Sequence, residues 1–233
     1  ALAPAGAGAL DYVTAEISAI SLRGVTAAAP RAGETAVVLG QGLIGAFSAA
    51  WLNAAGCRVI VADLEEGRLQ RAKKWAAATV KVADADASAR ILALCNGGAD
   101  IVVESSGSPQ GALMAYQLLR RKPQNYSSDY KVEPIQFYRG DWARLVVQAN
   151  YLDEVRINPF GFFPGEGVTI LTPSDRGVED RQMAVEQYRR GTLKAADFVQ
   201  TVAAVADAPA AYAALRDDKN NNFSLVFDWE SQP

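Results

Sequence analysis

Four residues of this sequence have the types and the spacing to hold a dinucleotide. Gly40, Gly42 and Gly45 form a G-x-G-x-x-G motif, and Asp63 follows Gly40 by 23 residues. In such a motif the first glycine allows a tight turn, the second lets the backbone approach a pyrophosphate, and the third lets a helix pack closely on a strand. An acid at this distance can accept hydrogen bonds from both hydroxyls of an adenosine ribose. Since its carboxylate would repel a 2′-phosphate, the pattern predicts NAD in preference to NADP.

The residues around this motif predict a strand, a helix and a second strand. Ala36–Leu39 is a short apolar run with two adjacent β-branched residues, which is typical of a buried strand. Leu43–Ala55 is small, apolar and free of proline, and Gly56 is suited to end a helix there. Arg58–Ala62 then forms a second strand that finishes on Asp63. The helix start offers free N–H groups to phosphates. Proteins that bind FAD or S-adenosylmethionine use related loops and are the alternatives.

The chain continues to alternate between strands and helices. We expect helices at Leu64–Ala78, Ala87–Leu94 and Pro109–Leu119, and strands at Val80–Val82, Asp100–Glu104 and Leu145–Gln148. This alternation indicates an α/β fold with a doubly wound parallel sheet, the Rossmann fold. Ser105 and Ser106 follow a predicted strand, at the end of the sheet where such folds bind ligands. Arg68 either reaches the adenosine ribose from the next helix or is a solvated surface arginine.

The two ends of the chain and one internal stretch are less regular. Residues 1–10 read as a linker, and residues 121–143 and 158–164 as irregular segments. An irregular connection of this length is usually functional or mobile. Further helices are expected at Asp11–Thr26, Glu179–Arg190 and Ala208–Arg216, and further strands at Val168–Leu171 and Phe223–Phe227.

Composition limits the classes of function. The 233 residues are 50% hydrophobic and 21% charged with a net charge of −3, which gives no reason to expect nucleic-acid or membrane-surface binding. There is no bilayer-length apolar run and no basic start of a signal peptide, so a cytoplasmic location is the default expectation. The absence of histidine removes the commonest general base and zinc ligand. Cys57 and Cys95 are not spaced as a metal-binding pair, and we expect both in the core.

The sequence resembles the medium-chain dehydrogenase/reductase family, the zinc-type alcohol and polyol dehydrogenases. The resemblance runs from about Val13 to Trp229. The matching segments are, in order, VVLGQGLIG, AGCRVIVAD, GADIVVESSGSPQGALMAYQLLR, VTILTPSDRG with RRGTLKAADFV, and DAPAAYAALRDDKNNNFSLVFDW. The segment 121–143 is the main departure from the family pattern.

This resemblance implies a set of cofactor-binding residues. They are Gly40, Gly42, Leu43, Ile44 and Gly45 at the pyrophosphate, Asp63 with Arg68 at the adenosine ribose, Ser105 and Ser106 under the cofactor, and Gln148 with Ala149 at the nicotinamide carboxamide. The stretch AEISAISL resembles the A-E-P-L-A stretch of polyol dehydrogenases. Glu16 therefore corresponds to an acid beside the catalytic zinc, although the proline is missing here.

The resemblance also implies a domain organisation. In this family the catalytic domain is mostly N-terminal and supplies the zinc ligands. Residues 1–30 would be a linker and helix on the catalytic-domain side, 31–191 the NAD-binding domain with the insertion 121–143, and 192–233 a segment returning toward the catalytic domain. The expected architecture is thus a Rossmann fold with a remnant of a second catalytic domain at the termini. Zinc is expected only if a missing N-terminal domain precedes this chain, and the returning segment favours a missing piece over a lost domain.

Three functions follow from these observations. The first is an NAD(H)-dependent oxidoreductase of the alcohol/polyol dehydrogenase type, which transfers a hydride between a small alcohol or carbonyl substrate and nicotinamide. The second is a non-catalytic NAD(P)-binding module. The third is a zinc-free reductase using Tyr126, Tyr130 and Lys131, whose spacing does not fit the Y-x-x-x-K arrangement.

The sequence also bears on assembly and on the substrate. The predicted strand Val168–Leu171 would be an apolar sheet edge, so we expect a homodimer that pairs this edge with its copy. The insertion and the Phe160–Phe163 loop are expected to shape the substrate pocket, but they do not identify the substrate.

Overall fold

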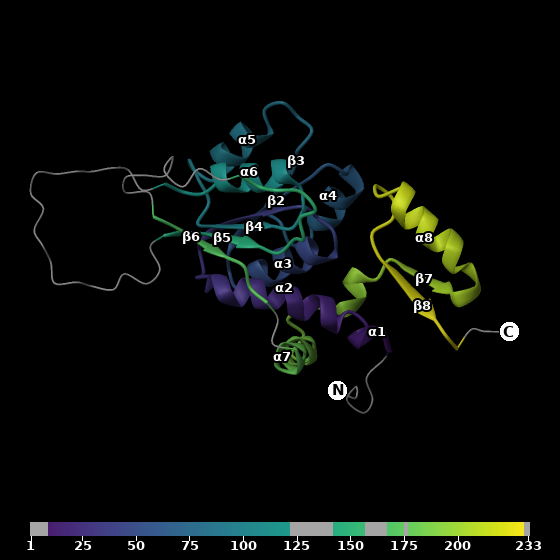
Figure 1. Ribbon diagram of the computed structural model, residues 1–233. Coiled ribbons are helices and arrows are strands. Elements are labelled where there is room, and N and C mark those ends of the chain that lie inside the picture. Colours follow the sequence, from purple (N-terminus) through teal and green to yellow (C-terminus); the bar gives the residue numbers. More distant parts are fainter. Residues whose placement is uncertain (1–8, 122–141, 157–166, 175–176, 231–233) are drawn as a thin grey trace, which may run out of the picture.

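The computed structural model describes residues 9–121, 142–156, 167–174 and 177–230. Within these ranges the centre of the molecule is a parallel sheet with the strand order β3-β2-β1-β4-β5-β6 (Figure 1). The strands are β1 (Thr35–Leu39), β2 (Arg58–Asp63), β3 (Ala78–Lys81), β4 (Ile101–Glu104), β5 (Ala143–Val147) and β6 (Val168–Leu171). The order reverses between β1 and β4, which is the place where doubly wound sheets open a crevice for ligands.

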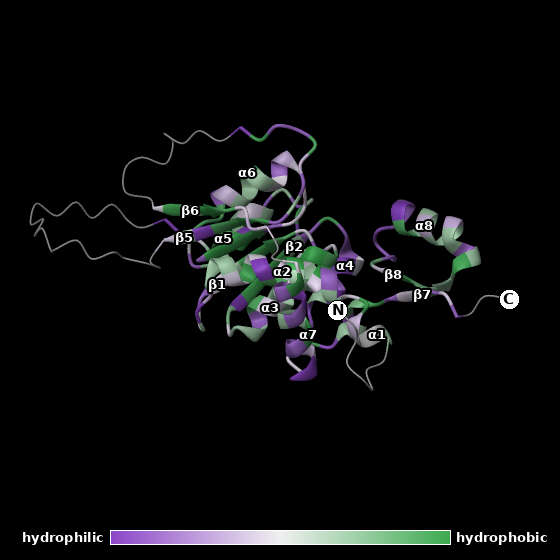
Figure 2. Cartoon of the chain, turned by 60° about the horizontal axis from the view of Figure 1, so that its bottom comes forward, coloured by the Kyte–Doolittle hydropathy of each residue, from purple (hydrophilic) through white to green (hydrophobic). Residues whose placement is uncertain are grey.

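The central strands β1, β2, β4 and β5 are buried on both faces, and their sequences are almost continuously apolar. Side chains alternate across the sheet, so neighbouring residues enter different clusters: Val38 packs into one core cluster and Val37 into the other. The helices α2 (Ala15–Ala28), α3 (Leu43–Ala54) and α4 (Glu66–Ala72) cover the first face, and α5 (Ala87–Leu94) and α6 (Pro109–Gln117) cover the second. Figure 2 shows that β2 and β6 are mostly hydrophobic. The predicted doubly wound α/β fold is therefore confirmed.

Two predicted helices differ from those observed. The expected helix Asp11–Thr26 is divided into α1 (Ala9–Tyr12) and α2, and the division falls at Val13 and Thr14, whose β-branched side chains have low helix propensity. The expected helix Leu64–Ala78 is much shorter as α4, because β3 already begins at Ala78 and pairs with Ile60 of β2. The chain turns between the end of α4 at Ala72 and the start of β3 at Ala78.

Glycines end two helices as the sequence predicts. Gly56 follows α3 with φ of 84°, and Gly191 follows α7 (Val178–Arg189) with φ of 74°. Both angles are in the left-handed region that favours glycine. The helix α7 packs on α2, where Arg23 Nε donates a 2.9 Å hydrogen bond to Asp180 Oδ2.

The C-terminal segment forms a second, two-stranded parallel sheet. Its elements are the 3-10 helices η2 (Ala195–Phe198) and η3 (Val205–Asp207), the strands β7 (Thr201–Ala204) and β8 (Leu225–Asp228), and the helix α8 (Ala208–Asp217). Figure 1 shows β7, β8 and α8 beside the large sheet and outside its layers. Phe198 of η2 anchors the segment, since its ring stacks on Phe47 of α3 with centroids 3.7 Å apart and on Trp75 at 4.8 Å.

Several expectations concern residues outside the described ranges. The insertion 121–143 falls almost wholly there, as do the tyrosines and the lysine considered for a zinc-free reductase and the Phe160–Phe163 loop. The assignment of residues 1–30 and 192–233 to a catalytic-domain side stays a prediction.

Candidate nucleotide-binding site

A cavity of about 480 Å³ opens at the carboxyl ends of β1, β2 and β4. Its lining includes six residues predicted from the sequence, namely Gly40, Gly42, Asp63, Arg68, Ser105 and Ser106. Gln110 and Met114 of α6 form another part of the wall, and Lys219 reaches the cavity from the C-terminal segment. We call this space the nucleotide cavity, because it lies at the point where the strand order reverses.

The three motif glycines meet different surroundings. Gly40 has φ of 86°, and a Cβ built on it would lie 2.8 Å from the backbone N of Ser106. A Cβ on Gly45 would lie 1.8 Å from the carbonyl oxygen of Gly40, whereas a Cβ on Gly42 would meet no atom within 4 Å. Packing therefore requires Gly40 and Gly45 to be glycine. Gly42 instead leaves open space at the cavity, which fits the approach of a diphosphate.

Leu43 and Ile44 form the first turn of α3, directly after the N-cap residue Gly42. Neither side chain lines the nucleotide cavity. Their place at the pyrophosphate stays a prediction. The backbone N–H groups of a first helical turn have no partner within the helix. The helix α3 thus begins beside the cavity with the polarity that favours an anion.

Asp63 is held in a fixed orientation at the end of β2. Its carboxylate accepts a 2.6 Å hydrogen bond from the backbone N of Gln41 and a 2.8 Å hydrogen bond from the backbone N of Glu65. Only 6% of its surface is exposed. Arg68 Nη1 lies 3.9 Å from Asp63 Oδ2, with 19% of the arginine side chain exposed. Arg68 is therefore part of the cavity wall, and of the two interpretations of this residue the solvated surface arginine is the poorer.

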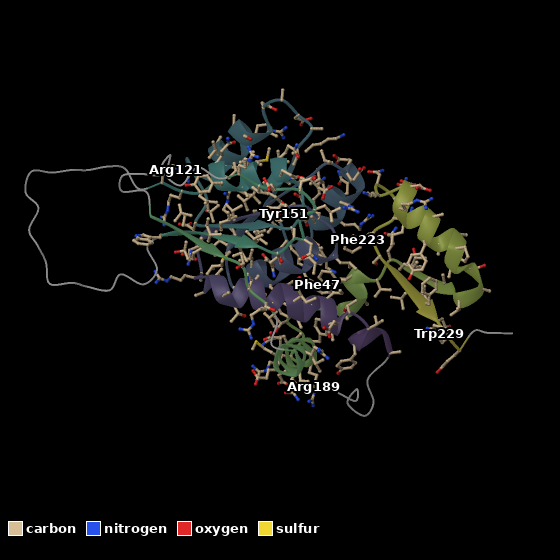
Figure 3. The ribbon with its side chains drawn as sticks, in the orientation of Figure 1. Phe47, Arg121, Tyr151, Arg189, Phe223 and Trp229 are labelled. Atoms are coloured by element: carbon tan, nitrogen blue, oxygen red, sulfur yellow. The ribbon has the colours of Figure 1, made fainter. Side chains whose placement is uncertain are left out.

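The loop after β4 is fastened by a buried carboxylate. Glu104 is fully buried and accepts hydrogen bonds from the backbone N of Ser106 at 2.8 Å, from the Ser106 hydroxyl and from the Tyr151 hydroxyl. Burial, and then the bond to Glu104, raise the pKa of Tyr151 far above its usual value, so its hydroxyl stays a donor at neutral pH. Ser105 Oγ donates to the carbonyl oxygen of Leu39 at 2.8 Å, which ties this loop to the glycine motif. Figure 3 labels Tyr151.

The side chain of Gln148 connects two helices. Its Nε2 donates to the carbonyl oxygen of Ile20 at 2.8 Å, and its Oε1 accepts from Ser48 Oγ at 2.8 Å, so it bridges α2 and α3. The side chain does not line the nucleotide cavity. The predicted contact to nicotinamide concerned the backbone at Gln148 and Ala149, and it stays a prediction.

Glu16, the candidate zinc neighbour, forms an exposed ion pair with Arg181, with Nε and Oε2 2.6 Å apart. No group of three or more acidic, cysteine or histidine residues suited to a metal exists in the described part of the chain. The assignment of Glu16 beside a zinc stays a prediction.

Cys57 and Cys95 are buried free thiols in the two core clusters, which confirms their expected core position.

Three residues that line the nucleotide cavity or hold its loops in place have a weak signal in the sequence or none. Glu104 ends an apolar strand just before Ser-Ser-Gly, a pattern that could have marked it. Tyr151 and Lys219 have no such pattern, because only the fold brings Tyr151 to Glu104 and Lys219 to the cavity. Arg68 Nε donates to the carbonyl oxygen of Lys219 at 3.3 Å, and the backbone N of Gly67 donates to Asn220 Oδ1 at 2.7 Å.

The chain has a Rossmann-type fold, and its cavity lies where dinucleotide-binding proteins of this fold hold their ligand. Comparison with known proteins goes one step further. Residues 44–124 match the model of a family described as zinc-binding dehydrogenase. Over 224 residues the chain is 25% identical to 2-dehydro-3-deoxy-L-galactonate 5-dehydrogenase of Pseudoalteromonas atlantica, a match that covers 96% of this chain and 60% of the relative. These matches agree with the resemblance seen in the motifs: the chain is similar to zinc-type medium-chain dehydrogenases.

Solved structures share the fold at low sequence identity. Zinc dependent alcohol dehydrogenase 2 from Streptococcus pneumonia superposes with a TM-score of 0.82 at 14% identity, covering 100% of this chain and 62% of that one. A short chain alcohol dehydrogenase from E. coli CFT073, complexed with NADH, has a TM-score of 0.80 at 16% identity, covering 97% and 61%. The chain thus spans about three-fifths of the length of the relatives it matches. Among the described residues, no helix is long and apolar enough to cross a membrane.

Proposed function

We propose that this chain forms the NAD(H)-binding part of an oxidoreductase of the alcohol/polyol dehydrogenase type. Such an enzyme transfers a hydride between an alcohol or carbonyl substrate and the nicotinamide. The observation that carries the proposal is the meeting of Gly42 and Asp63 in one cavity at the carboxyl ends of β1 and β2. The names of its relatives, which are dehydrogenases, and the NADH in one related structure support it.

The residues of the nucleotide cavity fit a dinucleotide. The open space at Gly42 admits the diphosphate to the backbone, and the start of α3 adds favourable N–H groups. Asp63 presents a carboxylate to the ribose diol, and two backbone N–H groups hold that carboxylate in place. The bound nicotinamide would supply the hydride acceptor. The task of this chain is to orient it.

The same carboxylate supports NAD over NADP. A 2′-phosphate on the ribose would bring a second anionic group to Asp63, and the repulsion is strong because that side chain is almost fully removed from water. Arg68 lies near enough to reduce this repulsion but not to cancel it, since its nearest nitrogen is 3.9 Å from the carboxylate.

Zinc chemistry would need ligands from outside the described residues. Glu16 is already paired with Arg181, and one acid does not hold a metal alone. We therefore assign zinc only to an enzyme in which a further domain provides the ligands. No observation on the described residues supports the alternative function of a non-catalytic binding module.

Titration of the protein with NADH and NADPH, followed by nucleotide fluorescence, tests the proposal. We expect NADH to bind more tightly, and Asp63→Asn to reduce the preference by about tenfold, because the substitution removes the negative charge without changing the shape of the side chain. Asp84→Asn is the matched control, since Asp84 is an exposed acid paired with Arg90 on the surface.

Two results would contradict this assignment. If Asp63→Asn discriminates between the nucleotides as well as the unsubstituted protein does, Asp63 does not bind the ribose. If the unsubstituted protein binds neither nucleotide, the dehydrogenase proposal itself fails.

A further inference from the structure

A second cavity lies behind the glycine motif. Its volume is about 190 Å³, and it is enclosed by the start of α3, by α4 and the turn after it, by η2 and by Phe223. We call it the annex cavity. Arg68 lines both the annex cavity and the nucleotide cavity, so the two spaces adjoin.

The annex cavity has an excess of positive charge. Arg68, Arg71 and Lys74 contribute three cations, and Asp197 is the one acid in its lining. Asp197 is already engaged, because its Oδ1 lies 2.5 Å from Lys74 Nζ. Arg71 has no ion-pair partner among the described residues. Burial, and then the charge of Arg68, lower the pKa of Arg71.

Two buried polar atoms of the lining lack hydrogen-bond partners in the described part of the chain. They are Arg71 Nε and Gln41 Oε1. Gln41 is only 1% exposed, and its Nε2 donates to the carbonyl oxygen of Gly40 at 3.0 Å, which fixes the amide with Oε1 unpaired. A buried donor or acceptor without a partner is costly, and a polar occupant of the annex cavity would satisfy both atoms.

The orientation of Arg71 is set by its surroundings. Its guanidinium carbon lies 5.2 Å from the centre of the Phe223 ring, and Nη2 donates to the carbonyl oxygen of Asn220 at 3.5 Å. These contacts hold one edge of the guanidinium and leave Nε for another acceptor. The arginine is therefore placed in advance for a ligand.

We propose that the annex cavity is a phosphate-binding site. Arg71 Nε donates to a phosphate oxygen, Arg68 supplies further positive charge, and a protonated phosphate oxygen donates to Gln41 Oε1. Hydrogen phosphate and phosphate monoesters can both donate and accept, as the two unpaired atoms require, whereas chloride can only accept. The ligand is inorganic phosphate or the monoester phosphate of a bound nucleotide. This inference does not depend on the proposed dehydrogenase function.

Calorimetric titration of the full chain with inorganic phosphate, at an ionic strength held constant with chloride, tests the site. We expect Arg71→Gln to weaken phosphate binding by about tenfold or more, because it removes a charged hydrogen bond. Arg90→Gln is the matched control, since Arg90 is an exposed arginine that pairs with Asp84 away from both cavities. If Arg71→Gln and Arg90→Gln bind phosphate equally, or if chloride replaces phosphate, the annex cavity holds only water and the proposal is wrong.

A second variant, Arg71→Lys, separates a loss of phosphate binding from a loss of folding, because it keeps the charge and the packing against Phe223. We expect this variant to recover most of the phosphate affinity with an unchanged melting temperature. Failure of the lysine to recover any affinity, in a protein that melts normally, would count against a charge-based site.

Titrations with NADH and NADPH in the presence of phosphate identify the source of the ligand. Competition of phosphate with NADPH alone assigns the site to a nucleotide monoester, and simultaneous binding of phosphate and nucleotide assigns it to free phosphate. Either result requires the site. If the protein binds phosphate but no dinucleotide, the phosphate site is supported and the proposed function is wrong. If it binds a dinucleotide but no phosphate, the proposed function is supported and the phosphate site is wrong.

Discussion

Gly42 and Gly45 belong to one motif, but the structure gives them different tasks. Gly45 is glycine because the backbone of Gly40 occupies the place of a side chain, whereas Gly42 borders open space. We expect Gly45→Ala to lower the free energy of unfolding by about 3 kcal/mol, as overpacking against backbone does. We expect Gly42→Ala to change it by less than about 1 kcal/mol, because its backbone is already extended and unstrained.

The two substitutions should affect NADH affinity in the opposite order, with the larger loss in Gly42→Ala. The new methyl group of Gly42→Ala would stand where the diphosphate approaches, and we expect NADH affinity to fall about tenfold or more in a protein that folds normally. Urea unfolding and NADH titration of both variants provide the check, and each variant is the control for the other. A Gly42→Ala protein with unchanged NADH affinity would show that the diphosphate lies elsewhere.

The same residues show what the sequence can and cannot reveal about the site. Gly40, Gly42, Asp63 and Arg68 line one cavity, as a local pattern of strand, loop and helix predicts. Tyr151 was missed because its role depends on Glu104 of a neighbouring strand, and hydrogen bonds between distant segments leave no local spacing. The end of a strand predicts a site for Gln148, but that pattern does not determine where the side chain points, which is between α2 and α3.

At the scale of elements, Arg144 joins three parts of the first core face. Its Nη1 donates to the carbonyl oxygen of Ala28 at the end of α2 at 3.1 Å, and its Nη2 lies 2.6 Å from Glu34 Oε1 just before β1. The two charged side chains are 9% and 14% exposed. Arg144→Met would leave the Glu34 carboxylate partly buried without its cation, so we expect a loss of about 3 kcal/mol in unfolding free energy.

Arg90→Met is the comparison for this experiment, because the exposed pair of Arg90 with Asp84 should contribute less than about 1 kcal/mol. Chemical unfolding of the two variants under the same conditions measures the difference. Equal stability of the two variants would show that Arg144 does not bind α2 and β5 together.

Elements with strong local signals were predicted closely, and those that depend on partners were not. The helix α5 has the predicted bounds, Ala87–Leu94, since Gly97 and Gly98 mark the turn that follows. The strand β7 was missed, because Thr201–Ala204 is four residues long and becomes a strand only by pairing with β8. The helix α4 was predicted too long, because its helical pattern continues into residues whose conformation is decided by β3.

At the scale of the whole molecule, β6 is an edge strand of the large sheet, as expected. Ile170, near its centre, is 47% exposed. We propose that this edge pairs with its copy in a homodimer, which would bury the isoleucine and the unpaired backbone groups. Ile170→Lys should then produce a monomer in light scattering at concentrations where the unsubstituted protein is a dimer.

Val202→Lys serves as the control for this experiment, because Val202 is equally exposed but belongs to the small sheet. A dimer that persists in Ile170→Lys would place the interface elsewhere. A monomeric unsubstituted protein would refute the proposed dimer altogether.

The loop that carries Lys219 and Asn220 completes the wall of the nucleotide cavity and binds the first turn of α4. During synthesis on the ribosome, the large sheet can therefore emerge and pair before its ligand crevice has all of its walls. Only when Lys219 and Asn220 have left the exit tunnel can this loop reach Gly67, whose missing side chain makes room for it. A nascent chain stalled before Lys219 would have the glycine motif and Asp63 but an incomplete rim of the nucleotide cavity.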